Sequence, residues 1–289
     1  MLCLKAKNGK VLWSKHLVDD FDAREPQYGF TASPILEGNL LLLNANSRML
    51  ALDRNAGTLT WSVEDEAPGE SMGTYSTGVV AEIDGKRCAL LLGTTALHVV
   101  EVETGDELWT FEHGDGKHPV ADPMVKGNRV LLSLAHSCLM LELSESGVRD
   151  LWRSSDLNTM LAPPLCLDAH LYGTHWPADV FVSSWSWDWM LRLDWPFRCV
   201  NWETGDVMWE KTMESTAVTA AGEMLMILEL GGTLHIVEAS PDSFRERSST
   251  DVLSGRKAKR LFATPPVLLE GKIYCRNYNG ELVCIDVSE

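Results

Sequence analysis

The side chains most capable of chemistry in this chain are its histidines, cysteines and a cluster of tryptophans. His113 and His118 flank a Gly-Asp-Gly-Lys stretch, and His170 and His175 flank an apolar, strand-like run. Zinc sites usually show a HExxH or paired CxxC spacing, and neither pattern occurs here. The acidic stretch 19–22 lacks the alternating aspartates and the glycine of a dedicated calcium loop. We therefore predict no metal site, and keep the histidines as candidates for ligand contacts.

Five tryptophans lie within 20 residues of one segment, 173–197. They are Trp176, Trp185, Trp187, Trp189 and Trp195. The middle three alternate with other residues, so in a strand their rings would share one face. Such an aromatic platform could bind a sugar ring, a quinone or a peptide. The alternative, which we favour, is an extra hairpin that covers the fold or serves oligomerisation. The candidate ligand-binding set is these tryptophans with His113, His118 and His175.

The spacing of the cysteines and the absence of familiar catalytic motifs argue against an enzyme. The seven cysteines include no adjacent pair and no CxxC, and most lie in apolar runs, such as Cys275 and Cys284. They are predicted to be free, buried small hydrophobes. The sequence also has no GxSxG elbow, no phosphate-binding P-loop and no GxGxxG fingerprint. We predict no catalytic residues, and a binding function is favoured over catalysis.

Composition excludes several classes of partner. The 289 residues carry 25 basic and 41 acidic side chains, a net charge of −16, while 45% are hydrophobic. This charge argues against nucleic acid, whose binding relies on lysine and arginine. The longest apolar stretch, 218–230, is interrupted by Glu223 and Glu229, so no membrane span is predicted. The first ten residues do not resemble a secretion signal. Taken as given, the sequence therefore favours a cytoplasmic location for the protein.

A short unit recurs along the chain: an apolar strand, a polar position, a glycine turn and then a tryptophan. Its glycines and tryptophans are Gly9 and Trp13, Gly57 and Trp61, Gly105 and Trp109, Gly147 and Trp152, and Gly205 and Trp209. The glycines are 48, 48, 42 and 58 residues apart. Degenerate copies of the repeat follow near 236–244 and 282–286. The longest period is the one that contains the tryptophan-rich segment.

Each period contains four strand-like runs separated by turns. Six sets of the first three strands (A, B and C) begin near residues 31, 77, 120, 161, 216 and 263, and the tryptophan lies on strand D. Four antiparallel strands every 40 to 50 residues predict the blades of a β-propeller. We therefore predict an all-β fold of about six blades in one domain, 1–289, with an insertion at 173–197. The repeated indoles and glycines are predicted to dock neighbouring blades and to have no role in ligand chemistry.

The repeat resembles the tryptophan-docking motif of the quinoprotein-like (PQQ-like) β-propellers. The match is intact at 51–61, Ala-x-Asp-x-x-x-Gly-x-x-x-Trp, and the last blade, 264–286, is similar to uncharacterised bacterial PQQ-binding-like repeat proteins. More distant members are quinoprotein alcohol dehydrogenases and BamB-type assembly lipoproteins. Such relatives have about eight blades and a signal sequence. The resemblance therefore implies a truncated chain or the loss of two blades, and, if truncated, a periplasmic or other extracytoplasmic location.

The resemblance leaves three functions open. Quinoprotein dehydrogenases use a Cys-Cys disulfide, a tryptophan, a Ca²⁺ site and an aspartate base; this sequence has no Cys-Cys pair, and no matching ion-and-base motif can be placed on it. We expect no cofactor, with PQQ and Ca²⁺ as the alternative. The leading hypothesis is a non-catalytic scaffold that binds a protein or small ligand on the face bearing the D–A and B–C loops. The others are a degenerate quinone-dependent redox protein and a BamB-type assembly factor, although Cys3 has no preceding lipidation signal. Exposed edge strands or the tryptophan-rich segment could also support an oligomer.

Overall fold

The computed structural model describes eight stretches of the chain. These are residues 1–65, 73–114, 119–159, 162–176, 194–214, 216–252, 264–277 and 279–288. They form two compact units. Unit 1 comprises Met1–Arg153 with Met160–Pro163, and unit 2 comprises Ser154–Thr159 with Pro164–Glu289.

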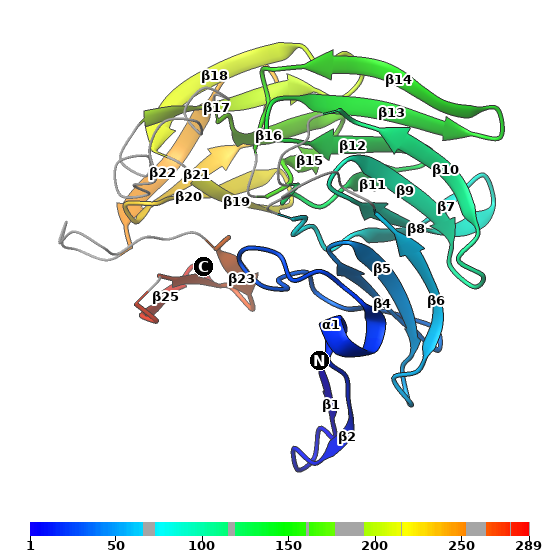
Figure 1. The fold of residues 1–289 in the computed structure, drawn as a ribbon. Coiled ribbons are helices and arrows are strands. Elements are labelled where there is room, and N and C mark those ends of the chain that lie inside the picture. The colour runs from blue at the N-terminus through cyan, green and yellow to red at the C-terminus, as the bar shows by residue number, and fades with distance from the viewer. Residues whose placement is uncertain are drawn as a thin grey trace. The chain divides into compact units, whose positions relative to one another are not determined.

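Unit 1 contains a hairpin followed by three four-stranded antiparallel sheets, in which each strand pairs with the next along the chain (Figure 1). The hairpin is β1 (Leu2–Leu4) and β2 (Val11–Ser14). The first sheet is β3 (Ile35–Glu37), β4 (Leu40–Ala45), β5 (Arg48–Asp53) and β6 (Leu59–Glu64). The second is β7 (Val79–Ile83), β8 (Lys86–Leu92), β9 (Ala96–Glu101) and β10 (Glu107–Glu112). The third is β11 (Met124–Lys126), β12 (Arg129–Ser133), β13 (Cys138–Ser144) and β14 (Gly147–Ser154).

Unit 2 repeats the same meander twice and ends in a three-stranded sheet. Its first sheet is β15 (Leu165–Leu167), β16 (His170–Thr174), β17 (Asp194–Asn201) and β18 (Val207–Glu214). Its second is β19 (Thr216–Ala221), β20 (Met224–Glu229), β21 (Thr233–Glu238) and β22 (Arg245–Asp251). The last is β23 (Val267–Leu269), β24 (Lys272–Arg276) and β25 (Leu282–Asp286). These sheets confirm the predicted all-β propeller and its six A–B–C sets.

The tryptophan of each of four D strands reaches the backbone of the following sheet. The indole N–H of Trp13 donates to Arg54 O at 3.1 Å, and that of Trp61 donates to Val102 O at 2.9 Å. Trp109 and Trp209 make the same bond to Ser144 O and Ser240 O, at 3.0 and 2.8 Å. Each bond joins one sheet to its successor within the same unit, and so links neighbouring blades.

The polar residue at the end of strand C shapes the turn that precedes the tryptophan. The Asp53 carboxylate accepts the backbone N–H groups of Asn55 and Ala56, both at 2.8 Å. These two bonds hold the pKa of Asp53 below its ordinary value. Gly57 then takes a φ of +68°, in the left-handed region that glycine tolerates, and faces the Trp13 ring. Local hydrogen bonding therefore sets up the surface on which the indole docks.

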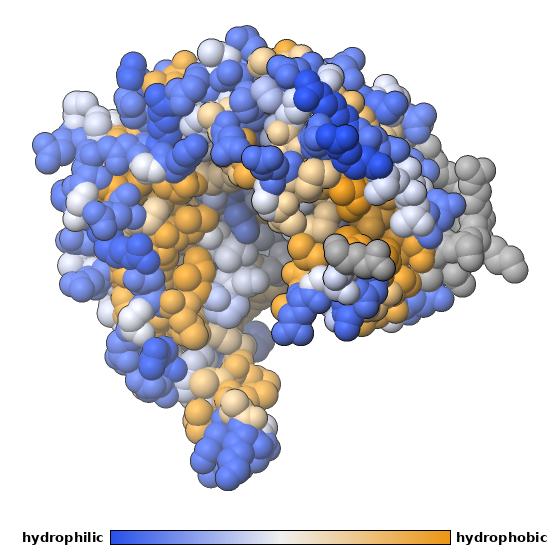
Figure 2. All heavy atoms as spheres, turned by 180° about the vertical axis from the view of Figure 1, so that it is seen from behind, coloured by the Kyte–Doolittle hydropathy of each residue, from blue (hydrophilic) through white to orange (hydrophobic). Residues whose placement is uncertain are grey.

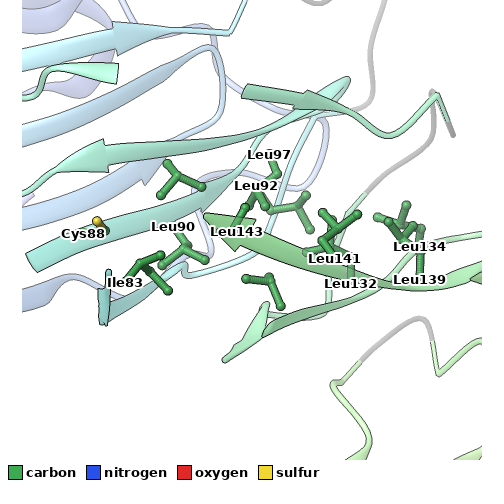
Figure 3. Packing of buried hydrophobic residues seen from close by; sticks show 12 residues of the cluster. Ile83, Cys88, Leu90, Leu92, Leu97, Leu132, Leu134, Leu139, Leu141 and Leu143 are labelled. Atoms are coloured by element: carbon green, nitrogen blue, oxygen red, sulfur yellow. The ribbon is translucent and has the colours of Figure 1, made fainter. Parts of the chain in front are cut away.

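Apolar side chains of strands B and C fill the space between sheets. Figure 3 shows this packing between the second and third sheets of unit 1, where Leu90 and Leu92 of β8 lie toward Leu132 of β12 and Leu141 of β13. These leucines have no exposed surface. The alternation of strand residues produces this arrangement, because every second side chain points to the same neighbouring sheet.

Two local features add to the predicted fold. The short helix α1 (Leu17–Phe21) begins at His16, whose ring accepts the N–H of Asp19, in a connection that the sequence predicted to be a loop. The hairpin β1–β2 exposes apolar side chains beside a hydrophilic tip, as seen at the lower end of Figure 2. The exposed apolar residues are Leu2, Leu4, Val11 and Leu12.

Candidate binding surface at the loop-rich ends of the blades

In unit 1, three successive D–A connections are tied to one another by side-chain hydrogen bonds. Ser33 N donates to Thr77 Oγ1 at 3.2 Å, and Thr77 N donates in turn to the Asp122 carboxylate at 2.6 Å. Tyr75 N also donates to Pro119 O at 2.8 Å. These bonds connect the segments that precede β3, β7 and β11. The described parts of the three connections are therefore bonded to one another.

Asn46 and Gly73 fix the first two of these connections together. Asn46 lies in the B–C turn with φ 64° and is almost completely buried. Its amide donates to Arg24 O at 2.9 Å and accepts the Thr74 N–H at 3.1 Å. A side chain at Gly73 would meet the Pro26 ring at 2.5 Å. The close approach requires glycine at this position and holds the backbone around it in place.

A tyrosine pair lies on this surface. Tyr28 N donates to the Tyr75 hydroxyl at 3.3 Å, and the two ring centroids are 5.8 Å apart with a 48° tilt. Tyr28 is 53% exposed, whereas Tyr75 is partly covered. Burial raises the pKa of Tyr75. The surface thus presents an aromatic ring with a polar tip, the type of side chain that protein interfaces use most.

In the same unit, a buried carboxylate joins the first sheet to the second. Asp65 follows β6 and accepts the Thr94 N–H at 2.6 Å, while its other oxygen lies 3.6 Å from His98 Nε2. Burial opposes its ionisation, but His98 and the Thr94 N–H hold the pKa of Asp65 below its ordinary value. His98 Nδ1 lies 2.6 Å from the Glu107 carboxylate. The His98 imidazole therefore lies between a buried carboxylate, Asp65, and a partly exposed one, Glu107.

The predicted histidine in unit 1, His113, has a supporting role in the same region. It is buried, and its ring nitrogen Nε2 lies 3.2 Å from Gly93 O. Its backbone N–H donates to Thr95 O at 3.0 Å. These contacts hold the B–C turn of the second sheet. The structure therefore places His113 beneath the surface, and His118 lies outside the described residues.

In unit 2, the predicted residues that the structure describes form the base of the tryptophan-rich segment. Trp176 and Trp195 stack at 5.3 Å with an 18° tilt, and they are only 4% and 3% exposed. His175 Nδ1 accepts the Asn158 N–H at 3.2 Å, and Trp176 N donates to Asn158 O at 2.7 Å. These three predicted residues are brought together as a packed base. Trp185, Trp187 and Trp189 lie outside the described residues.

The bounds of the insertion also differ from the prediction. Gly173 and Thr174 belong to β16, and β17 begins at Asp194, so the connection between these strands is 175–193. The ends of the predicted segment are strand residues because they pair across the sheet: Thr174 lies opposite Phe197, and Gly173 lies opposite Arg198.

Acid is expected to destabilise unit 2 through His175. Burial, with the Arg198 charge, lowers the pKa of His175 to about 4. As the pH falls below about 6.5, the unfolded chain binds a proton before the folded one does. We expect the free energy of unfolding to fall by about 2–3 kcal/mol between pH 7 and about pH 4.5 through this group alone. Urea unfolding of the wild type and His175→Gln at both pH values measures it, and equal losses in the two proteins would contradict it.

Within the part of the chain that the structure describes, no group of three or more His, Cys, Asp or Glu side chains is arranged to hold a metal ion. The described cysteines are all free. Burial raises the pKa of the thiols of Cys199 and Cys275 to about 11, which makes both poor nucleophiles. Cys284, predicted to be buried, is exposed, because it lies on the face of β25 opposite to Val283 and Ile285, which pack against the buried cluster of unit 2.

The blades, with the indole of one sheet bonded to the next, define a β-propeller of the quinoprotein-like class. Residues 1–187 match the profile of the family described as outer membrane protein assembly factor BamB. This match spans more than half of the chain, and the chain belongs to that family. A search of curated protein sequences found no match.

Solved structures show the same fold at low sequence identity. BamB from Moraxella catarrhalis superposes with a TM-score of 0.68 at 16% identity, covering 98% of this chain and 77% of that one. A europium-containing methanol dehydrogenase gives 0.54 at 11% identity, covering 86% of this chain and 62% of that one. A quinohemoprotein alcohol dehydrogenase from Pseudomonas putida gives 0.53 at 13% identity, covering 88% and 52%. The chain thus spans less than two thirds of either dehydrogenase.

Proposed function

We propose that this chain is a scaffold that binds a protein partner through the D–A connections of unit 1. The family description, an outer membrane protein assembly factor, supports a protein as the ligand. It also supports an extracytoplasmic site of action, as part of an assembly machinery. Within the described residues, no helix is long and apolar enough to cross a membrane.

The observation that carries the proposal is the exposed Tyr28 ring beside segments that are hydrogen-bonded to one another. A partner that docks there meets an aromatic anchor whose backbone N–H is held by Tyr75. The bonds among Ser33, Thr77 and Asp122 fix the neighbouring connections. Binding to a preorganised surface loses little conformational freedom, which favours affinity.

Site-specific photocrosslinking tests the proposal. A benzophenone side chain replaces Tyr28 in one variant and Leu59 in a control, since Leu59 is similarly exposed, at 48%, but lies at the start of β6 by the C–D turn. We expect a discrete protein adduct from position 28 in cells and none from position 59. A Tyr75→Ala background should reduce the adduct at position 28 by about threefold or more, because the anchor loses its support. No adduct at position 28, or equal adducts at both positions, would contradict the proposal.

The quinone-dependent alternative makes a different prediction. If the chain were a redox protein of that kind, PQQ and Ca²⁺ added together would give a bound-cofactor absorbance and support oxidation of an alcohol or sugar. The scaffold proposal predicts that PQQ does not bind, with or without Ca²⁺. Equilibrium dialysis of PQQ against the protein separates the two functions, whatever the outcome of crosslinking.

A further inference from the structure

Two histidines occupy the same place in two different blades. His98 of β9 and His235 of β21 each stand three residues before the last residue of their strand, Glu101 and Glu238. Each also has a glutamate partner on the adjacent D strand. Glu107 lies opposite Val100, and Glu246 lies opposite Val237, which in both cases is the residue two places after the histidine. The two pairs are therefore the same structural module, present once in each unit.

In each module the imidazole lies between two carboxylates. His98 Nδ1 is 2.6 Å from Glu107, and its Nε2 is 3.6 Å from Asp65. His235 Nδ1 is 2.8 Å from Glu246, and its Nε2 is 2.6 Å from Glu229. Both nitrogens of His235 are thus within hydrogen-bond distance of a carboxylate, whereas the contact of His98 Nε2 with Asp65 is longer than a hydrogen bond and becomes an ion pair when the ring is protonated.

A neutral imidazole has one N–H and cannot donate to both of its neighbours. Only the protonated ring satisfies both carboxylates, and the geometry thus favours the charged form. Because the side chains of both histidines are largely buried, at 10% and 12% exposed, this preference is weakly screened by solvent.

The second carboxylate of each module connects one blade to the next. In unit 1, Asp65 follows the D strand β6 and holds the Thr94 N–H in the following B–C turn. In unit 2, Glu229 accepts the N–H of Glu214 at 3.3 Å, and Glu214 holds the Gly231 N–H of the B–C turn at 2.6 Å. In unit 1 the carboxylate that holds the B–C turn therefore contacts the histidine directly, whereas in unit 2 the histidine contacts Glu229, and Glu214 links Glu229 to the turn.

Each turn leaves room for the carboxylate that bonds to it, which is Asp65 in unit 1 and Glu214 in unit 2. A Cβ at Gly93 would lie 2.6 Å from the Asp65 carboxylate, and a Cβ at Gly231 would overlap the carboxylate of Glu214. Only glycine leaves room for the oxygen at such close range. The same solution in both units indicates that the carboxylate contact is an integral part of each turn.

We propose that His98 and His235 are proton-dependent latches that fasten the end of one blade to the B–C turn of the next. In the protonated form each latch is closed. Loss of the proton takes a donor from one of the two carboxylates and so weakens the bonds that reach the B–C turn, directly through Asp65 in unit 1 and through Glu229 and Glu214 in unit 2. The latch operates in the free protein, so this proposal can be tested independently of the partner proposed above.

The surrounding charges support closure at neutral pH. Burial lowers the pKa of both histidines, but the carboxylates outweigh it and the net pKa of each is raised above its ordinary value. Asp65 and Glu107 face His98, while Glu229 and Glu246 face His235, with Lys211 near Glu246. Since the folded-state pKa values are raised, the stability from these groups is complete below about pH 6.5 and is lost as the pH rises through the folded values.

In a third blade an arginine, whose charge is permanent, occupies the corresponding strand position, although its partner Glu210 lies directly opposite it and not opposite the residue two places after it. Arg198 of β17 also stands three residues before the end of its strand, Asn201, and bonds Glu210 of the D strand at 3.1 Å and Asp156 O in the preceding connection. An arginine does not lose its proton in this pH range. Replacing a latch histidine by arginine should therefore keep the latch closed at every pH in this range.

Nuclear magnetic resonance of the free protein tests the latches. The imidazole C–H signals of His98 and His235, assigned from the His→Gln variants, should titrate above pH 6.5, and that of His175 near pH 4. Amide exchange of Thr94 and Gly231, corrected for intrinsic rates, should accelerate about fivefold or more between about pH 6 and pH 8.5. The indole N–H of Trp61 serves as the internal control, because its bond to Val102 O joins two groups that do not titrate in this range.

Variants separate the charge from the packing. His98→Gln should expose the Thr94 amide already at about pH 6 and leave Gly231 unchanged. The control His16→Gln, at a histidine whose side chain is 69% exposed, should change neither. His98→Arg should keep Thr94 protected at about pH 8.5.

Two results would overturn the proposal. One is that the two wild-type histidines titrate at or below pH 6.5, their ordinary range. The other is that Thr94 and Gly231 keep their protection at high pH. The wild-type titration decides the question even if a variant fails to fold.

Discussion

Replacing Trp61 by alanine is expected to lower the free energy of unfolding by about 3–5 kcal/mol, the usual cost of removing a buried indole. Trp61 is only 8% exposed, packs over the turn of the next blade and donates its N–H to Val102 O. The substitution removes the ring, leaves a cavity and deprives the carbonyl of its donor. Urea unfolding followed by circular dichroism measures the loss.

A milder variant separates the two contributions. Trp61→Phe keeps much of the apolar contact but lacks the N–H, and it should cost about 1–2 kcal/mol. A loss below about 1 kcal/mol for Trp61→Ala would mean that the indole does not hold the two blades together.

The complementary change, Gly105→Ala, is expected to cost about 2–4 kcal/mol. The new Cβ would lie 2.6 Å from the Trp61 ring, and the residue has φ +77°. Gly38→Ala is a matched control, because Gly38 has φ +55° but a methyl group added there would meet no atom within 4 Å. The control isolates the backbone cost, which should be about 1 kcal/mol.

The two substitutions should not be additive. Once Trp61 is alanine, the methyl group at position 105 has room, and Gly105→Ala should cost only about 1 kcal/mol, as at Gly38. A double-mutant cycle measured by the same unfolding experiment gives this coupling. Additive losses would show that the glycine is needed for its backbone conformation alone.

The fold could be predicted from the sequence because its signal is repeated. In each intact repeat the tryptophan follows the glycine by four or five residues, and the runs between these motifs are apolar and bounded by turns. These local patterns determine where strands begin and turn. The helix α1 escaped prediction because it is short, at five residues, and is capped by the unusual residue His16.

The candidate surface was predicted less completely, because its contacts join residues that are far apart in the chain. Tyr28 and Tyr75 are 47 residues apart, and Ser33 and Thr77 are 44 apart. No spacing rule links them. Composition instead drew attention to Trp176 and Trp195, which the structure places in a buried stack.

The histidine latches were also missed, although one signal was available. His98 and His235 interrupt otherwise apolar strands, and each has a glutamate in the following strand. Strand alignment across the repeats would have placed both histidines, and Arg198, at the same position. Their second carboxylate partners could not be found in this way, since Asp65 and Glu229 come from different parts of the repeat.

Hydrogen exchange of the tryptophan indoles tests most directly whether these side chains tie successive blades together. The N–H groups of Trp13, Trp61, Trp109 and Trp209 each donate to a carbonyl of the following sheet. All four indole protons should exchange at least about 100-fold more slowly than a free indole, because exchange requires the blades to separate. Exchange at the free rate in the folded protein would contradict the docking of the blades.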